Sequence, residues 1–159
     1  MKINCRIRCF LFGSLITSLF WLNGCSLLNG ESEQFMAIAE TLKVPPTNGK
    51  LYYLLIPVDG CGKCVDKSIE FAKQHTKNSL LRIILVSNYG YKNAALRYVD
   101  DLPSHYVIDA KGKLIIAKFV DGYVTLIEIE NKSIALKKTL SPQDVDKDLA
   151  ELDKLLNHK

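Results

Sequence analysis

The part of the sequence best suited to chemistry is Cys61-Gly62-Lys63-Cys64, two cysteines separated by two residues. Cysteines at this spacing can close a small disulfide and open it again, so the pair can exchange electrons with a disulfide of another protein. A helical pattern over residues 65–75 follows the pair, which therefore lies at a helix N-terminus. Free backbone N–H groups and the helix dipole stabilise an anion at that place. We therefore expect Cys61 to attack as a thiolate, helped by the charge of Lys63, and Cys64 to resolve the mixed disulfide.

Other uses of the two cysteines stay open at this point. They could form a permanent structural disulfide that clamps the loop, although structural disulfides in exported proteins usually close longer loops. They could also bind copper or zinc together with His105, but a two-cysteine site needs further ligands and the chain has only 3 histidines. Asp59, two residues before Cys61, could either oppose the thiolate or accept its proton.

The segments around the cysteines alternate between strand and helix patterns. The run at 51–56 is continuously apolar, as in a strand buried on both faces, and it delivers the chain to the cysteines. We expect further strands at 81–86, 105–108, 113–120, 123–130 and 133–138, with hairpin turns at 109–112 and 131–132. Helices are expected at 34–43, 65–75 and 91–99, and from a cap at Ser141 to the end of the chain.

This alternation predicts an α/β fold, a three-layer sandwich with a central mixed sheet and helices on both faces. The predicted hairpin at 123–138 and the final helix are extra C-terminal elements in this scheme. The chain of 159 residues is long enough for one such domain, which we place at residues 35–159.

The cysteine motif in this setting resembles the thioredoxin superfamily, and in particular the membrane-tethered thiol-disulfide oxidoreductases of the bacterial envelope. Residues 102–113, Leu-Pro-Ser-His-Tyr-Val-Ile-Asp-Ala-Lys-Gly-Lys, look like the second signature of that family, and the likeness covers roughly residues 48–120. The resemblance implies that Pro103 lies beside Cys61 and that the backbone of Leu102 pairs with the substrate chain. It also implies that no dissociable cofactor is needed, because electrons come from another dithiol protein.

Three features depart from the family pattern. Gly60 stands where the family usually has a tryptophan, and Leu55 stands where many members have a buried acid that assists proton transfer to the resolving cysteine. A hairpin also replaces the usual helix before the final one. The first two departures favour an alternative function, a non-catalytic interaction module of the envelope in which Cys61–Cys64 is a static disulfide. The third indicates a divergent branch of the superfamily.

The start of the chain has the features of an export signal. Lys2, Arg6 and Arg8 precede an apolar run at 10–22 that is too short to span a bilayer comfortably. The run ends in Leu22-Asn23-Gly24-Cys25, which resembles the lipobox of bacterial lipoproteins. The resemblance implies that residues 1–24 are a signal peptide removed by cleavage and that Cys25 carries the lipid.

We therefore expect a lipidated tether at residues 25–34 and a protein held in the bacterial cell envelope. Ser26 after the cysteine favours passage to the outer membrane, facing the periplasm, by resemblance to Gram-negative lipoproteins. Two or more buried acyl chains suffice for stable anchoring. An uncleaved membrane anchor with a chance cysteine is the alternative, and the polar stretch at 29–33 that follows at once speaks against it.

The charge of the chain argues against nucleic acid as a partner. Three of the 21 basic residues and none of the 17 acidic ones precede Cys25, which leaves 18 basic against 17 acidic residues in the remainder. A nearly neutral domain has no electrostatic footprint for phosphate backbones. The expected partners are a protein dithiol or disulfide and, through Cys25, the membrane, and nothing in the sequence indicates an oligomeric state.

Overall fold

The computed structural model describes residues 23–45, 48–88, 98 and 106–157, with the side chains of 23–29 excepted. A mixed sheet of five strands in the order β3-β2-β1-β4-β5 forms the centre of the described part. The strands are β1 (Lys50–Pro57), β2 (Leu81–Val86), β3 (Tyr106–Asp109), β4 (Val124–Glu130) and β5 (Ser133–Leu140). β2 runs parallel to β1 and β3 parallel to β2, whereas β4 runs antiparallel to β1 and β5 antiparallel to β4.

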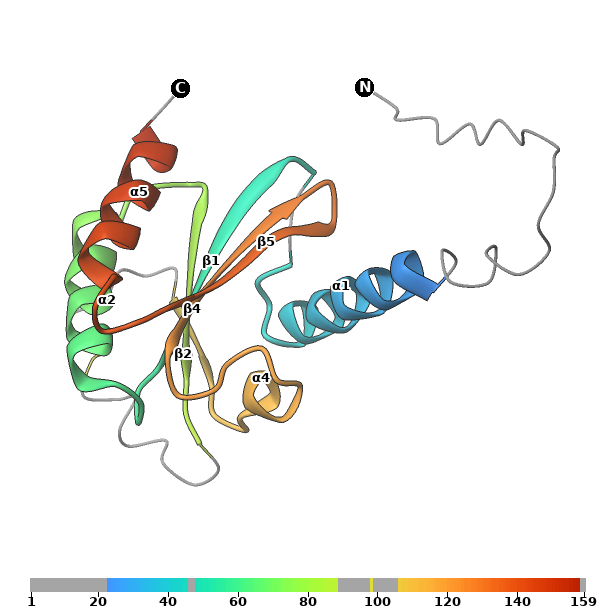
Figure 1. Cartoon of the computed structure of the whole chain (residues 1–159), viewed down its shortest axis with the longest axis horizontal. Helices are drawn as coiled ribbons and strands as arrows, with labels where there is room; N and C mark the ends of the chain where they lie inside the picture. Colours follow the sequence, from blue (N-terminus) through green and yellow to red (C-terminus); the bar gives the residue numbers. More distant parts are fainter. Residues whose placement is uncertain (1–22, 46–47, 89–97, 99–105, 158–159) are drawn as a thin grey trace, which may run out of the picture.

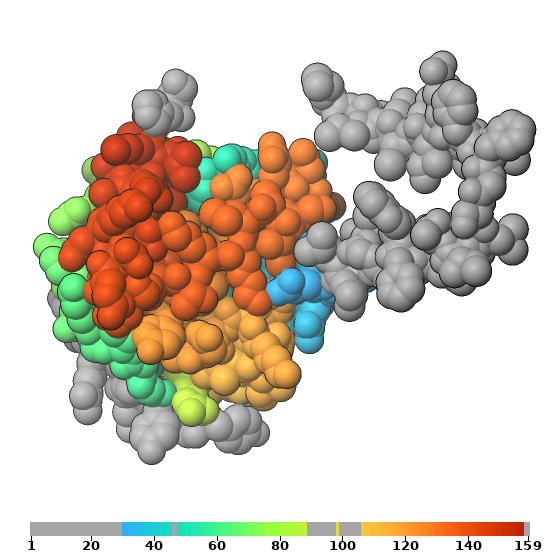
Figure 2. Space-filling model, in the orientation of Figure 1, coloured from blue at the N-terminus to red at the C-terminus, as the bar shows by residue number. Residues whose placement is uncertain are grey.

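Helices cover both faces of this sheet, so the predicted three-layer α/β sandwich is confirmed (Figure 1). The helices α2 (Gly62–Gln74) and α5 (Val145–Asn157) lie side by side on one face. On the other face lie α1 (Asn23–Thr41) and the short α4 (Lys113–Ile116). From the side shown in the space-filling view, α5, β5 and the α4 segment form a continuous surface (Figure 2).

β1 is buried on both faces, as its apolar run predicts. Tyr52, Leu54 and Ile56 belong to the hydrophobic core beneath α2 and α5. Leu51, Tyr53 and Leu55 point the other way, into the core beneath α1 and α4. The alternation follows from the period of two along a strand. Burial on both faces holds β1 in the middle of the sheet, and the chain runs from its end to the cysteines.

The prediction of a fourth strand at 113–120 is wrong, because the chain forms the helix α4 there. Asp109 at the end of β3 accepts a hydrogen bond from the backbone N–H of Leu114 at 2.8 Å, and this bond starts the turn. Gly112 adopts a left-handed φ of 60° just before it, and Lys118 ends it with the same φ. An apolar run this short does not distinguish a buried strand from a buried helix, and the capping carboxylate decides between them.

The predicted hairpin at 123–138 exists, but it completes the sheet and is not an addition to it. β4 pairs with β1 from Lys50 to Leu55, on the side opposite β2. Its turn has positive φ at Asn131 and Lys132, the geometry of a tight two-residue hairpin. Among the described strands β3 pairs only with β2, so the strand after Pro103 does not border β1.

The helix expected at 34–43 begins earlier, at Asn23, and covers much of the segment expected to be a tether. Ser32 accepts a hydrogen bond from the backbone N–H of Ile134 at 3.1 Å, and Glu31 pairs with Lys137 at 2.7 Å. These contacts attach the middle of α1 to β5. The polar stretch at 29–33 is therefore part of the helix and contacts the sheet. No helix in the described part of the chain is long and apolar enough to span a membrane.

The last helix begins as its sequence predicts, with a turn capped by Ser141. The Ser141 hydroxyl oxygen accepts a hydrogen bond from the backbone N–H of Asp144 at 3.2 Å and donates one to the Asp144 carboxylate at 2.9 Å. The helix expected at 91–99 lies largely outside the described residues.

Candidate active site

Cys61 is the N-cap residue of α2, directly after the turn that leaves β1. Its sulfur accepts a hydrogen bond from the backbone N–H of Cys64 at 3.4 Å, so it occupies the N-terminal end of the helix as a capping group does. Both cysteines are free thiols in the structure. The sequence prediction that the motif lies between a buried strand and a helix is therefore confirmed.

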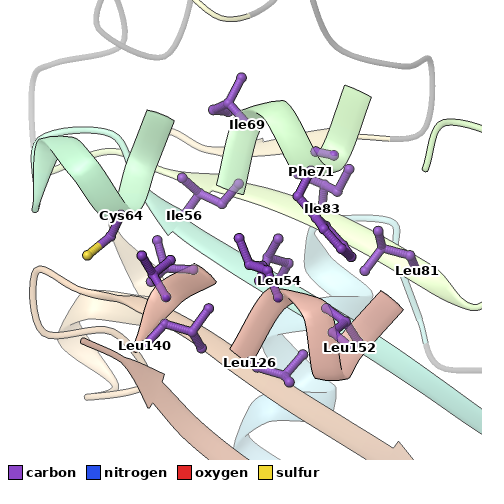
Figure 3. Close-up of a cluster of buried hydrophobic side chains, with 14 of the residues drawn as sticks. Leu54, Ile56, Cys64, Ile69, Phe71, Leu81, Ile83, Leu126, Leu140 and Leu152 are labelled. Atoms are coloured by element: carbon purple, nitrogen blue, oxygen red, sulfur yellow. The ribbon is translucent and has the colours of Figure 1, made fainter. Parts of the chain in front are cut away.

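The two sulfurs have different surroundings. Cys61 is half-buried, whereas Cys64 is fully buried at one end of the core cluster that includes Ile56 and Leu140 (Figure 3). Burial raises the pKa of the Cys64 thiol to about 11, and its hydrogen bond with Cys61 adds to this shift. Cys64 thus stays protonated at neutral pH, while the sulfur of Cys61 lies at the N-terminal end of α2.

The residue that contacts the Cys61 backbone is Gly122, which lies two residues before β4. The backbone N–H of Cys61 donates to the carbonyl oxygen of Gly122 at 3.0 Å. A Cβ atom on Gly60 would collide with that carbonyl oxygen and would lie 2.9 Å from Cγ of Pro57. The glycine that replaces the family's tryptophan therefore permits the close approach of the two backbones.

Neither Gly122 nor the exposed Tyr123 beside it was among the sequence-predicted site residues. The only available signal was Asp121-Gly122, a turn-forming pair immediately before a buried strand. Because β4 is antiparallel to β1, its first residues lie beside the end of β1 from which the cysteines emerge.

The charged residues near the motif are engaged by neighbouring elements. The Lys63 ammonium donates to the carbonyl oxygen of Pro142 at 2.8 Å and lies 3.9 Å from Asp146. Its charge therefore ties the cysteine loop to the start of α5. Asp59 accepts a hydrogen bond from the backbone N–H of Asn88 at 3.0 Å and so fixes the loop to the end of β2.

Several predicted site residues cannot be placed beside the cysteines. Pro103 and His105 lie outside the described residues, and so does the side chain of Cys25, whose backbone is in α1. Among the residues that the structure describes, no three histidine, cysteine or acidic side chains form a metal site. Leu55 is buried in the core beneath α1 and α4, so the family's acid has an apolar replacement at this position.

Comparisons with known proteins find relatives by structure only. No protein-family model matches the chain, and no curated protein sequence matches it. Among the solved structures, one from Chlorobium tepidum is of a protein assigned as a thiol:disulfide interchange protein, DsbE. It is 19% identical, with a TM-score of 0.50, and the match covers 70% of this chain and 82% of that one.

Two further structures also match. A thioredoxin-like protein from Porphyromonas gingivalis is 16% identical with a TM-score of 0.47, covering 74% of this chain and 83% of its own. A secreted disulfide oxidoreductase from Mycobacterium tuberculosis is 11% identical with a TM-score of 0.46, covering 65% of this chain and 81% of its own. At this level of identity the Chlorobium match establishes the fold alone: the chain has a thioredoxin-like fold.

Proposed function

We propose that this protein performs thiol-disulfide exchange through Cys61 and Cys64. The observation that carries the proposal is the asymmetry of the pair at the α2 N-terminus. Cys61 is accessible and caps the helix, whereas Cys64 is buried and its pKa is raised to about 11. An accessible sulfur at a helix N-terminus and a neighbouring buried thiol are the two groups that the reaction needs.

The exchange consists of two displacement steps. The Cys61 thiolate attacks one sulfur of a partner's disulfide, a new S–S bond forms, and the partner's other sulfur leaves as a thiolate that takes up a proton. Cys64 then loses its proton and attacks the Cys61 sulfur of this mixed disulfide. The partner leaves with both sulfurs reduced, and Cys61–Cys64 remains as a disulfide until another dithiol protein reduces it.

The reduction potential of the pair tests the proposal against the structural-disulfide alternative. The full chain is equilibrated in thiol–disulfide buffers, and the free thiols are then alkylated and counted. A potential between about −270 and −120 mV is the range of known exchange proteins and supports the proposal. A potential well below about −300 mV indicates a static disulfide and an interaction module, and contradicts it.

An insulin-disulfide reduction assay tests the same function by rate. We expect Cys61→Ser to abolish the activity, because no sulfur remains to form the mixed disulfide. Cys25→Ser, which removes a cysteine outside the pair, is the matched control and is expected to keep full activity. Equal rates for the native chain and Cys61→Ser contradict the proposal.

A substrate-side role of Pro103 is part of the proposal and is supported by the sequence resemblance. The geometry supports Tyr123 for the same role, since it follows Gly122, whose carbonyl oxygen accepts the Cys61 N–H. The two variants Pro103→Ala and Tyr123→Ala separate these positions in the insulin assay. The residue that borders the substrate is the one whose loss lowers kcat/KM without lowering the thermal stability.

We also propose that the protein acts in the bacterial cell envelope, anchored by lipid on Cys25 to the outer membrane. The proposal is supported by the basic start, the short apolar run and the Leu22-Asn23-Gly24-Cys25 motif. Metabolic labelling with palmitate in a bacterial host tests it, followed by separation of inner and outer membranes. We expect label on the native chain and on Cys61→Ser, and none on Cys25→Ser; label that persists on Cys25→Ser contradicts the anchor.

A further inference from the structure

A groove of about 370 Å³ lies directly beside the cysteine loop. Its apolar walls come from three elements: Pro57 at the end of β1, Val86 at the end of β2 and Ile115 of α4. Asp59 and Asp121 contribute the charged part of its lining. We refer to it as the flanking groove.

The flanking groove shares its backbone with the site of Cys61. Gly60 and Gly122 both line it, and these are the residues whose close approach lets the Gly122 carbonyl oxygen accept the Cys61 N–H. A side chain that enters the groove therefore belongs to a chain segment adjacent to the sulfur that Cys61 attacks. Because the groove lies next to Cys61, it is a candidate for the site that distinguishes one partner polypeptide from another.

The charges around Cys61 are arranged asymmetrically. The flanking groove carries the carboxylates of Asp59 and Asp121, both on exposed residues, and its lining contains no lysine or arginine among the residues that the structure describes. On α2, Lys63 and Lys67 lie 3.9 and 3.4 Å from Asp146 of α5, which offsets part of their charge. Since unbalanced charge in a groove with apolar walls attracts the opposite charge, the groove favours a cation.

We propose that the flanking groove binds a lysine or arginine side chain of the partner polypeptide, next to the cysteine that Cys61 attacks. The methylene groups of such a side chain pack against the half-buried Ile115 at the apolar wall, and the cationic end lies between Asp59 and Asp121. A long side chain with an apolar stem and a charged tip matches both parts of the lining. This inference deepens the proposed function and rests on it.

The test uses the full chain with serine at positions 5, 9, 25 and 64, so that Cys61 is its only cysteine. The probes are three short peptides with one cysteine activated as a mixed disulfide with thionitrobenzoate. They differ only at the residue after that cysteine, which is lysine, norleucine or glutamate. Attack by Cys61 forms the mixed disulfide with the peptide and releases one thionitrobenzoate anion, which is followed by its absorbance.

We expect the lysine peptide to react roughly fivefold faster than the glutamate peptide at low salt, with norleucine between them, because exposed charge pairs contribute modestly. Salt at about 0.5 M is expected to shrink this ratio by screening. In the variant Asp59→Asn with Asp121→Asn, the ratio is expected to fall toward one. Asn at position 59 keeps an oxygen that can accept the Asn88 N–H, so the loop keeps its attachment.

Glu40→Gln is the matched control, since it removes an exposed carboxylate of α1 that pairs with neither Lys63 nor Lys67. It is expected to leave the lysine-to-glutamate ratio well above one, as in the parent. Equal rates for the three peptides, or a ratio that survives loss of both groove carboxylates, overturn the groove proposal while leaving exchange by Cys61 intact. A chain whose Cys61 reacts with none of the peptides overturns the proposed function, and the role of the groove with it.

Discussion

The backbone N–H of Cys61 donates to the carbonyl oxygen of Gly122 at 3.0 Å, and this bond joins the cysteine loop to the segment just before β4. The two residues lie 61 positions apart in the sequence, and the antiparallel pairing of β4 with β1 brings them together. The bond orients the start of α2 relative to Tyr123, the exposed residue next to Gly122. The geometry of the candidate site thus depends on a backbone contact as well as on the two sulfurs.

Gly60→Ala is expected to disturb this contact. The added methyl group would collide with the Gly122 carbonyl oxygen and crowd Pro57 Cγ at 2.9 Å, so one of the two backbones has to move. We expect a loss of about 1–3 kcal/mol in the free energy of unfolding together with slower reaction of Cys61 with a disulfide probe. Chemical denaturation and a thionitrobenzoate assay measure the two effects.

Gly62→Ala is the matched control for this variant. A Cβ atom on Gly62 meets no heavy atom within 4 Å, and the residue is in the first turn of α2. Alanine there is expected to be neutral or slightly stabilising, because it favours the helix. The explanation by close backbone approach is wrong if Gly60→Ala and Gly62→Ala have the same stability.

The buried thiol of Cys64 predicts a pH dependence of stability for the reduced protein. Its pKa is about 11 when folded and has the ordinary value of 9.0 when unfolded. Between these values the unfolded state has lost the proton and the folded state has kept it, so the free energy of unfolding falls as the pH rises through this window. The stabilising contribution is fully present below about pH 9, and a loss on the order of 1–2 kcal/mol is expected toward pH 11.

Denaturation of the reduced protein at pH 8, 9.5 and 10.5 measures this loss. Tyr53, whose pKa burial raises to about 12, adds a dependence of the same sign. The comparison with Cys64→Ala therefore isolates the thiol, because that variant keeps the tyrosine. Parallel curves for the native chain and Cys64→Ala would show that the Cys64 thiol is as easily ionised in the folded state as in the unfolded one.

Local patterns in the sequence suffice to predict the strand and the helix that position the cysteines. The continuous apolar run of β1, the cysteine spacing and the amphipathic α2 predict the strand–helix junction, and the structure has it there. The turn at Asn131-Lys132 and the cap at Ser141 are equally local signals, and both are present. Each depends on neighbours within a few residues, which is why a single sequence contains the information.

Other features depend on partners distant in the chain, and the sequence does not contain them in readable form. The error at 113–120 has a local cause instead, because Asp109, five residues before Leu114, caps a helix where the apolar run alone predicts a strand. The polar segment at 29–33 continues α1 because β5 supplies partners for Glu31 and Ser32. Gly122 reaches Cys61 only because β4, and not the strand after Pro103, pairs with β1.

Phe35→Ala tests whether α1 is part of the folded domain. The Phe35 side chain is fully buried, with its ring centroid 5.1 Å from those of both Tyr53 and Phe119. Its truncation is expected to reduce the free energy of unfolding by about 3–5 kcal/mol, as for other buried phenylalanines. Denaturation monitored by circular dichroism measures the change, and Glu40→Ala on the exposed side of α1 is the control. A neutral Phe35→Ala would show that α1 is only a tether.

The ion pair between β5 and α5 gives the last prediction. The carboxylate of Asp148 is 5% exposed and lies 2.7 Å from the Lys138 ammonium, which also lies 3.5 Å from Glu151. Asp148 raises the pKa of Lys138, mainly through the hydrogen bond between the two side chains. Lys138→Met removes the partner and leaves a buried charge without compensation, so we expect a loss of about 2 kcal/mol at pH 7.

The double variant Lys138→Met with Asp148→Leu separates two causes of this loss: the unpaired buried carboxylate of Asp148 and the packing lost with the Lys138 side chain. Two apolar side chains of similar volume leave no buried charge, and such replacements are often neutral or stabilising. We therefore expect the double variant to recover most of the stability that Lys138→Met loses, as measured by urea denaturation. Lys147→Met, on the exposed side of α5, controls for the change of net charge. A double variant less stable than Lys138→Met would mean that β5 and α5 depend on the ionic contact itself, and that the core beneath them does not tolerate an apolar replacement.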